Sequence, residues 1–452
     1  MIRNPTGVLA RVLIPLFFGI AAFAQLPSNA TLKGSYYVRY LGKDTTAVAA
    51  VSFSGSMVFD GVGSYTLTGQ GASSKTTDKI LKTLGSGRYS VLSNGMLVID
   101  NPFDTSVPNN SGFLYGGLGG GIIVASSTYG GFLDLLIATP ASTANSTANL
   151  SGAYNVASLE FLAGSFTQTR NTFFPISADG KGGLGDVVVR GTAQSLRDAP
   201  AAQTSAAATY TVTANGTGTL VLPAPGGVTA GNTLLSGNKI LYAAPDGSFF
   251  IGGGATSYDL IIGAKAAPAA TLNGVYFTGY LENYAAGSDS DSVYAAGGAI
   301  NVIDATRWIW HERINSDIYY PYDSTYAASL EFSANGVSSG GHFAMGAGGN
   351  LLIGTGGDGD YRLEVHAKSV PMTASGSVFL NPQGLVNAAN NTPFTAQFAP
   401  GEVVTLYGSG FTTQTATATG SGYGANCAIA AFTPGTAICK NAAADRDRRT
   451  TL

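Results

Sequence analysis

The chain has 452 residues, of which 11% are charged, and its formal net charge is −3. Ordinary soluble domains carry about 25% charged residues, and nucleic-acid binding needs a basic surface, so this composition predicts no nucleic-acid partner. The 62 glycines, 22 tyrosines and 22 phenylalanines are typical of an all-β protein, with aromatic residues in strands and glycine in turns.

The first 24 residues have the pattern of a signal peptide. Arg3 and Arg11 supply a positive n-region, the apolar run at 12–23 has the length of an h-region, and the sequence AFA at 22–24 is a small-x-small cleavage site. We therefore expect residues 1–24 to be removed and the protein to be secreted or held at the cell surface. An uncleaved N-terminal anchor is the alternative. No later stretch approaches the roughly 18 apolar residues of a membrane span, so no transmembrane helix is expected.

The next element begins with the phrase TLKGSYYVRYL, and similar phrases occur twice more. Each phrase places a glycine two residues before a tyrosine, at 34 and 36, 152 and 154, and 274 and 276. Equivalent phrases at regular intervals indicate an internal repeat. We expect the tyrosine to fill the interior of each unit and the glycine to permit a close approach of the backbone at its first strand.

Later features keep the same order in each copy. Asp60-Gly61 and Asp179-Gly180 stand between alternating runs and predict type I′ hairpins, whereas the third copy has the weaker pair Asp304-Ala305. A second hairpin is predicted in every copy by Asn-Gly pairs at 94–95, 215–216 and 335–336. Each copy then closes on an aromatic-led strand, at 132–138, 258–264 and 361–367.

The repeat predicts three tandem antiparallel meander modules of about 120 residues each, every one a small barrel or a sandwich. Their expected bounds are 25–140, 146–266 and 268–371. The linkers between them are short and rich in small or polar residues, as domain boundaries are. Release of fragments of about 120 residues by limited proteolysis would support this division.

After Pro371 the composition changes, and residues 376–452 form a different segment. A Pro-Gly turn at 400–401 precedes an alternating strand at 403–407. The phrases LNPQGLVNAAN and FAPGEVVTLYGSGF, within Phe379–Phe411, closely resemble the start of an Ig-like C-terminal domain found in exported acidobacterial proteins of unknown function. The resemblance implies an Ig-like fold and carries over no catalytic residue. The chain ends before the further strands of that domain, so we expect a partial Ig-like segment with a disordered tail.

Both cysteines of the chain, Cys427 and Cys439, lie in this tail. In an oxidising compartment they could close a small loop through a disulfide, and two unpaired thiols are the alternative. The three modules contain no cysteine, so their folding must rest on apolar burial and strand pairing.

Three patterns resemble catalytic or metal sites but have a simpler interpretation. The sequence GVSSG at 336–340 matches the esterase pattern G-x-S-x-G, yet it follows a hairpin rather than a strand-to-helix turn. The histidines at 311, 342 and 366 are too widely spaced to predict a zinc site. The aspartate pairs 289/291 and 358/360 could hold Ca²⁺, although solvated turn residues are the simpler interpretation. No other cofactor is expected.

The segment Arg307–Asp323 is the one unusual candidate for a ligand site, and it holds both tryptophans of the chain. On a strand the two tryptophans share one face and His311 lies on the other. Aromatic rings beside Arg, Asp and Glu could stack on sugar faces and bind hydroxyls; the alternative is that the tryptophans form the core of the third module. The residues predicted to contact a ligand are Trp308, Trp310, His311, Tyr319, Tyr320 and Tyr322.

These observations lead to three hypotheses. The first is an exported, non-catalytic β-repeat protein that acts in cell-surface, adhesive or ligand binding, with a glycan or a cell-surface protein as its partner. The second is a carbohydrate-binding or carbohydrate-active protein that uses the aromatic strand of the third module; glycoside hydrolysis would need two carboxylates about 5–10 Å apart. The third is an outer-membrane β-barrel, which the alternating strands suit and the modular spacing does not.

Overall fold

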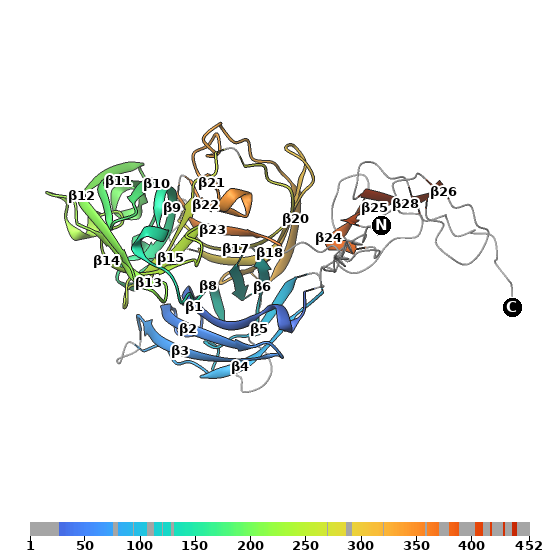
Figure 1. The fold of residues 1–452 in the computed structure, drawn as a ribbon, viewed down its shortest axis with the longest axis horizontal. Helices are drawn as coiled ribbons and strands as arrows, with labels where there is room; N and C mark the ends of the chain where they lie inside the picture. The colour runs from blue at the N-terminus through green and yellow to red at the C-terminus, as the bar shows by residue number, and fades with distance from the viewer. Residues whose placement is uncertain are drawn as a thin grey trace, which may run out of the picture.

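The computed structural model describes residues 27–75, 80–93, 95–105, 113–119, 121–127, 131–268, 270–285, 292–319, 321–357 and 359–369, and the backbone of five short strands between 379 and 440 (Figure 1). The expected signal peptide lies outside these residues. The described residues form strands and seven three-residue 3-10 turns, with no α-helix among them, so the predicted all-β class is confirmed. None of their helical turns is long and apolar enough to cross a membrane.

Module 1 is a closed antiparallel barrel of eight strands in sequence order. The last strand pairs with the first, with Val38 opposite Ala138, and this pairing closes the barrel. Large apolar side chains fill the interior, where Tyr40 stacks on Phe103 with 3.9 Å between ring centroids. The strands are β1 (Lys33–Asp44), β2 (Ala49–Asp60), β3 (Ser64–Ser73), β4 (Ser86–Val91), β5 (Met96–Asp100), β6 (Phe113–Gly119), β7 (Ile122–Ser127) and β8 (Phe132–Pro140).

Module 2 is a second closed barrel of eight strands with the same order. Its first strand lies between the second and the last, with Glu160 opposite both Arg170 and Asp259. One end of the interior is apolar and contains the buried rings of Tyr154 and Phe250. The strands are β9 (Ser151–Phe161), β10 (Thr169–Asp179), β11 (Gly183–Ala193), β12 (Ala201–Val212), β13 (Thr217–Leu222), β14 (Gly237–Ala243), β15 (Phe249–Gly253) and β16 (Asp259–Lys265).

Module 3 repeats this meander but does not close it with full strands. Its seven-stranded sheet has the order β20-β19-β18-β17-β23-β22-β21, so β20 and β21 are its edges. Between these edges the chain forms only isolated bridges, from Phe332 to Ser338 and from Val337 to Ala344. The strands are β17 (Gly274–Tyr284), β18 (Ser292–Val302), β19 (Trp308–Ser316), β20 (Tyr322–Ala327), β21 (Phe343–Gly346), β22 (Leu351–Thr355) and β23 (Asp360–Lys368).

The three modules lie side by side (Figure 1), and they pack around one common apolar core. This core is built from the outward-facing residues of the same strands in every copy, as shown by the buried leucines Leu41, Leu159 and Leu281. Polar contacts join each pair of modules. Arg39 binds Asp259, Lys43 binds Asp317, and the Asn283 amide donates to Thr169 Oγ1 at 2.6 Å. The modules therefore share one core and are joined by polar contacts as well as by their linkers.

The glycines that mark the repeat serve backbone conformation and not close packing. Gly34, Gly152 and Gly274 have φ angles of +104°, +92° and +80°. A Cβ atom at Gly34 or Gly274 would meet no atom within 4 Å, so the predicted close approach is wrong. A positive φ is readily adopted by glycine and strained for other residues. The tyrosines two residues later are buried, as predicted.

The first hairpin of each copy is organised by its aspartate. In place of a two-residue type I′ turn, a loop of three residues separates β2 from β3. The Oδ1 atom of Asp60 accepts hydrogen bonds from the backbone N–H groups of Val62, Gly63 and Ser64 at 2.8–2.9 Å. Asp304 accepts from two backbone N–H groups in the same way. The third copy thus keeps the turn although it lacks the glycine.

The predicted Asn-Gly hairpins are confirmed in the second and third copies. At Gly216 and Gly336 the φ angles are +90° and +77°, and both glycine N–H groups donate to the carbonyl three residues earlier. Gly95 has the same conformation in the first copy, where Asn94 lies outside the described residues. This geometry is a type I turn followed by a residue with positive φ, a common hairpin connection.

Beyond the three modules the structure describes the backbone of five strands. β24 (Phe379–Asn387), β25 (Val403–Ser409) and β28 (Thr436–Lys440) form an antiparallel sheet, and β26 (Ala416–Thr417) pairs with β27 (Ala428–Ile429). The predicted strand at 403–407 is confirmed as part of β25. The remainder of 376–452 lies outside the described residues, and the Ig-like resemblance stays a prediction.

Candidate functional site

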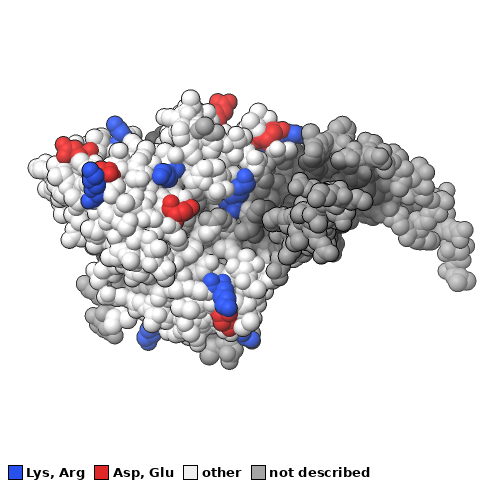
Figure 2. Space-filling view, in the orientation of Figure 1, with Lys and Arg blue, Asp and Glu red and all other residues white. Residues whose placement is uncertain are grey.

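The molecule carries few charges on its surface and several inside. Figure 2 shows scattered charged side chains on the face that it displays, with no broad patch of one sign. In contrast, ten Lys, Arg, Asp and Glu residues with less than a tenth of their surface exposed lie in the described interiors and interfaces. These residues are Arg39, Lys43, Asp104, Asp134, Glu160, Arg170, Lys239, Asp259, Glu312 and Glu364. A buried charge is unfavourable unless it is paired, so the pairing of each group indicates whether it serves structure or a ligand.

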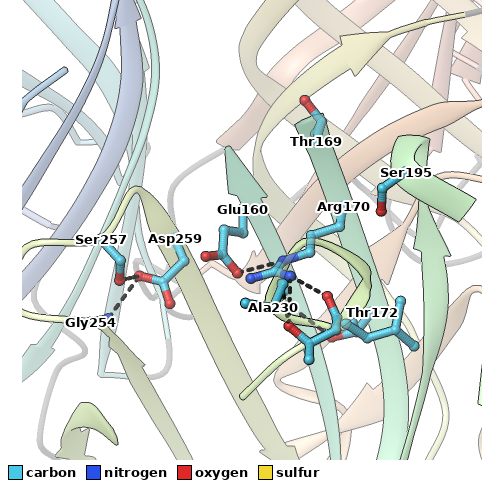
Figure 3. Close-up of polar contacts among 12 residues, drawn as sticks. Glu160, Thr169, Arg170, Thr172, Ser195, Ala230, Gly254, Ser257 and Asp259 are labelled. Carbon is cyan, nitrogen blue, oxygen red and sulfur yellow. Dashed lines mark hydrogen bonds and ion pairs between the residues drawn. The ribbon is translucent and has the colours of Figure 1, made fainter. Parts of the chain in front are cut away.

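In module 2 every buried carboxylate has a close cation, and Figure 3 shows the pair of Glu160 with Arg170. Arg170 Nε lies 2.9 Å from Glu160, and its guanidinium also donates to Thr233. Asp259 is bound by Lys239 at 2.6 Å and by Arg39 of module 1 at 2.9 Å. Burial acts to raise the pKa of Asp259, but these two cations lower it well below its usual range. This network is complete, which is the arrangement expected of a structural interface.

In module 3 the charged side chains alternate with apolar ones along β17 and β23. Leu363 and Val365 face outward into the shared core, so their neighbours Arg362, Glu364 and His366 face inward. Directly opposite residues share a face, and Glu282 is opposite Arg362 while Tyr280 is opposite Glu364. The inward face of module 3 is therefore polar at one end.

We call this end the acidic mouth; it comprises Glu282, Glu312, Asp360, Arg362 and Glu364. Arg362 is the only Lys or Arg among its described residues. Its nitrogens lie 3.9 Å from Glu282, 3.5 Å from Asp360 and 3.5 Å from Glu364. These separations exceed those of ordinary charge-assisted hydrogen bonds, which are about 2.7–2.9 Å. One guanidinium thus lies at loose distances from three of the four carboxyl groups, and it also acts electrostatically on the fourth, Glu312.

The carboxyl groups of the acidic mouth differ in pKa, because burial and mutual repulsion raise some of the values while nearby cations lower another. Burial, followed by the charge of Asp360, raises the pKa of Glu282 to about 8. Burial and the charge of Glu364 raise the pKa of Glu312 to about 8. The pKa of Glu364 is lowered, because Arg362 and His366 outweigh its burial. At neutral pH the mouth therefore holds both neutral and ionised carboxyl groups.

Several buried polar atoms of this interior have no hydrogen-bond partner among the described residues. They include Glu312 Oε1 and Thr278 Oγ1, whose residues are 3% and 0% exposed, and Asp360 Oδ1. The other oxygen of Glu312 accepts from the Tyr326 hydroxyl at 3.3 Å. Buried polar atoms are almost always hydrogen-bonded in native proteins, so unpaired acceptors facing one interior indicate a site for a polar ligand or water.

The outer residues of the acidic mouth are partly exposed to solvent. Exposure of the side chains falls from 26% at Arg362 and 14% at Glu282 to 2% at Glu364, deeper in the module. Tyr322 and Tyr326 face the interior from the edge strand β20 and are 44% and 41% exposed. A ligand could therefore reach the carboxyl groups past tyrosine rings.

A groove lies near the acidic mouth, between modules 2 and 3. It has a volume of about 370 Å³, which is within the usual range for small-molecule sites. Module 2 contributes Asn171 and Arg190, and module 3 contributes His342 and the Gly356-Gly357 backbone. His342 is close enough to lower the pKa of Asp360, against the larger opposing effect of burial. The groove thus adjoins the carboxyl groups.

The residues that the sequence predicted as ligand contacts separate into two groups. Trp308 and Trp310 are only 2% and 4% exposed and form a stack of rings with Phe332 and Tyr326. They pack the inner end of module 3, which is the core alternative weighed above, and they do not present a surface for glycans. His311 is buried and its Nδ1 lies 2.7 Å from Thr325 Oγ1.

The tyrosines of this segment lie near the mouth. Tyr319 is 61% exposed and Tyr322 is 44% exposed, while Tyr320 lies outside the described residues. Burial and the nearby charges of Glu282 and Glu312 raise the pKa of Tyr322. Among the described residues predicted to contact a ligand, Tyr322 is therefore the one whose pKa is raised by carboxyl groups of the acidic mouth.

The other sequence candidates do not assemble into a site. The histidines His311, His342 and His366 do not converge, and the described residues contain no group of three metal-ligating side chains. Ser338 belongs to the hairpin between β20 and β21, with no helix after it. The aspartates 289, 291 and 358 and Cys427 lie outside the described residues; the structure describes only the backbone of Cys439, in β28.

The acidic mouth was missed at the level of sequence, although a signal was present. The run DYRLEVHAK has a polar residue at every second position, which normally indicates a strand with one wet outer face. Here the apolar residues face outward because the other two modules cover that face. The polar residues Asp360, Arg362 and Glu364 must then point into the module.

These features define an all-β protein of three antiparallel modules around a shared core, one of which has an acidic interior whose outer residues are partly exposed to solvent. No family model and no curated protein matches the chain.

Proposed function

We propose that this chain is an exported, non-catalytic β-repeat protein whose third module binds a small ligand at the acidic mouth. One observation carries the proposal: buried acceptors without partners lie on the same face of the sheet as Tyr322 and Tyr326 of the edge strand β20, which are 44% and 41% exposed. Modules 1 and 2 support the third by holding its outward faces in the shared core. A role at the cell surface or in adhesion is compatible with such a receptor.

The comparison with modules 1 and 2 supports the choice of module 3. The interior of module 1 is filled by buried aromatic and aliphatic side chains such as Phe53 and Phe59. Module 2 has an apolar interior end and, at its other end, carboxylates that are each paired with a cation. Neither described interior combines unpaired acceptors, excess carboxyl groups and access from solvent.

Export rests on the N-terminal pattern, and mass spectrometry of the secreted protein would test it. We expect a mature N-terminus at Gln25. A retained N-terminus in membrane fractions would instead support the uncleaved anchor.

Ligand binding at module 3 can be tested by blocking it sterically. Ser324 faces the interior directly opposite Glu312, so Ser324→Trp would fill the mouth. We expect fragments detected by ligand-observed NMR with the native chain to be lost in this variant. Asp323→Trp places the same ring on the outward face of the same strand and is the matched control. Fragments that bind both variants equally, or no binding by the native chain, would refute the proposal.

A carbohydrate-active role is a second candidate, and the paired carboxyl groups favour it. Glu312 has a raised pKa and Glu364 a lowered one within the same interior. Carboxyl groups whose environments push their pKa values apart serve as acid and nucleophile in glycoside hydrolysis. Release of nitrophenol from aryl glycosides, abolished by Glu312→Gln, would support this role; unchanged release in that variant would refute it.

A further inference from the structure

The acidic mouth holds more carboxyl groups than its one guanidinium can neutralise once all of them are ionised, although His366 Nε2 also lies 3.0 Å from Glu364 Oε1. Four carboxyl groups face one guanidinium, which leaves an excess of three negative charges when all are ionised. The titratable and charged groups that face this interior or act on it are Tyr280, Glu282, Tyr294, Glu312, Tyr322, Tyr326, His342, Asp360, Arg362, Glu364 and His366. Apart from Arg362, only the two histidines can become cations.

The repeat shows that this excess is particular to the third copy. Glu282 lies six residues after Tyr276, as Glu160 lies six after Tyr154. In module 2 the residue opposite Glu160 on the next strand is Arg170, which binds it at 2.9 Å. In module 3 the residue opposite Glu282 is Tyr294. The position that holds the resident cation in one copy thus holds an aromatic ring in the other.

The geometry around the mouth suits a cation from solution. Tyr322 and Tyr294 lie around Glu282, and tyrosine ring faces attract ammonium groups. Arg362 already lies over the Tyr280 ring, 5.5 Å from its centroid. The unpaired acceptors Glu312 Oε1, Asp360 Oδ1 and Thr278 Oγ1 offer oxygen atoms for N–H donors.

We propose that the acidic mouth of module 3 binds a small organic cation that carries primary ammonium groups. This inference rests on the proposed function and specifies its ligand class. A primary ammonium has three donors and would bind carboxylate oxygens at the place that Arg170 occupies in module 2. A bound metal ion is less well supported, because the described residues include no group of three metal ligands. An anionic ligand would meet repulsion from the carboxyl groups.

The probe is 1,4-diaminobutane, compared with 1,4-butanediol and succinate, which have the same chain length but are neutral and anionic. Isothermal titration of the full chain at pH 9 keeps the alkyl ammonium groups charged, since their pKa is close to that of lysine at about 10.4. We expect the diamine to bind at least tenfold more tightly than either four-carbon control. Raising the salt concentration should weaken its binding.

Tyr294→Arg restores the cation that module 2 carries, and we expect it to abolish binding of the diamine while the fold is retained. Val62→Arg adds the same charge at a residue that is 79% exposed in module 1, and we expect it to leave binding unchanged. The inference that the ligand is a cation would be overturned if butanediol or succinate bound as tightly as the diamine, or more tightly. If Ser324→Trp abolished that binding, the proposed function would still stand. Diamine binding that survives Tyr294→Arg, or absent binding of the diamine, would also overturn the inference.

Discussion

Modules 2 and 3 repeat one sequence pattern, and both carry a glutamate at the same position of their first strand. This glutamate has a close cation in module 2 but not in module 3. Glu160 in module 2 has Arg170 directly opposite, with 2.9 Å between Arg170 Nε and the carboxylate. Glu282 in module 3 has Tyr294 opposite, and its nearest described cation, Arg362, lies 3.9 Å away. The same strand position is a complete ion pair in one copy and a half-buried carboxyl group without a close cation in the other.

The difference teaches where to look for function in a repeated fold. Both modules need an apolar interior end for stability, and both have one. The polar ends differ in how their carboxyl groups are neutralised, while the same strand positions supply the shared core in both copies. A site can therefore arise in one copy by the loss of a counterion while the packing of the whole molecule is retained.

The largest effect should come from the apolar end of module 3. Trp310→Ala removes a ring that is 4% exposed and stacked between Trp308 and Tyr326. We expect a loss of about 3–5 kcal/mol in the free energy of unfolding, measured by urea denaturation. Tyr322→Ala, at a ring that is 44% exposed, should change it by less than about 0.5 kcal/mol. If Trp310→Ala left the free energy of unfolding unchanged, this ring would not be part of the core.

Among the substitutions, the second largest effect on stability should come from the Glu160–Arg170 ion pair of module 2. Arg170→Met leaves Glu160 buried without its cation, and we expect a loss of about 3 kcal/mol at pH 7. The exposed Arg190 lies on the neighbouring strand β11, and Arg190→Met should change stability by less than about 0.5 kcal/mol. Similar unfolding midpoints for the two variants would show that the Glu160–Arg170 pair does not stabilise module 2.

The pH dependence of stability should reveal that the carboxyl groups in the acidic mouth of module 3 lack enough cations. Glu282 and Glu312 have folded-state pKa values raised to about 8. Their stabilisation is therefore complete below the unfolded value and is lost as the pH rises through about 8. We expect the free energy of unfolding to fall by up to about 4 kcal/mol for each of the two groups between pH 5 and pH 9. Glu312→Gln should flatten this dependence in thermal melts, whereas Glu331→Gln, at an exposed residue, should not. An identical pH dependence in both variants would contradict the raised pKa.

The smallest effect concerns a feature that both modules share. Gly274→Ala introduces a Cβ into open space at a φ of +80°, so only the backbone conformation is strained. We expect a loss of about 1 kcal/mol. Gly85→Ala, also in open space but without a left-handed φ, should be close to neutral. Equal effects of the two substitutions would show that φ is not the reason for the repeated glycine.

Much of the architecture followed from local patterns. The aromatic-led strands, the Asn-Gly hairpins and the triplication depend on contacts within about a dozen residues, and the alternation of apolar side chains predicted them. The hairpins at Asp60 and Asp179 were placed correctly, but their turn type was wrong. A side-chain carboxylate that binds successive N–H groups allows a longer loop, and a two-residue pattern does not anticipate it.

The sequence by itself determined the all-β class and the three copies, because strand alternation and turn chemistry are local. Only the tertiary structure decided which face of each strand points inward. On β23 the apolar residues Leu363 and Val365 are covered by the other two modules, and the charged residues Arg362 and Glu364 must face the interior. Strand alternation is symmetric between the two faces, so the choice between a wet surface and an acidic interior depended on contacts between distant modules.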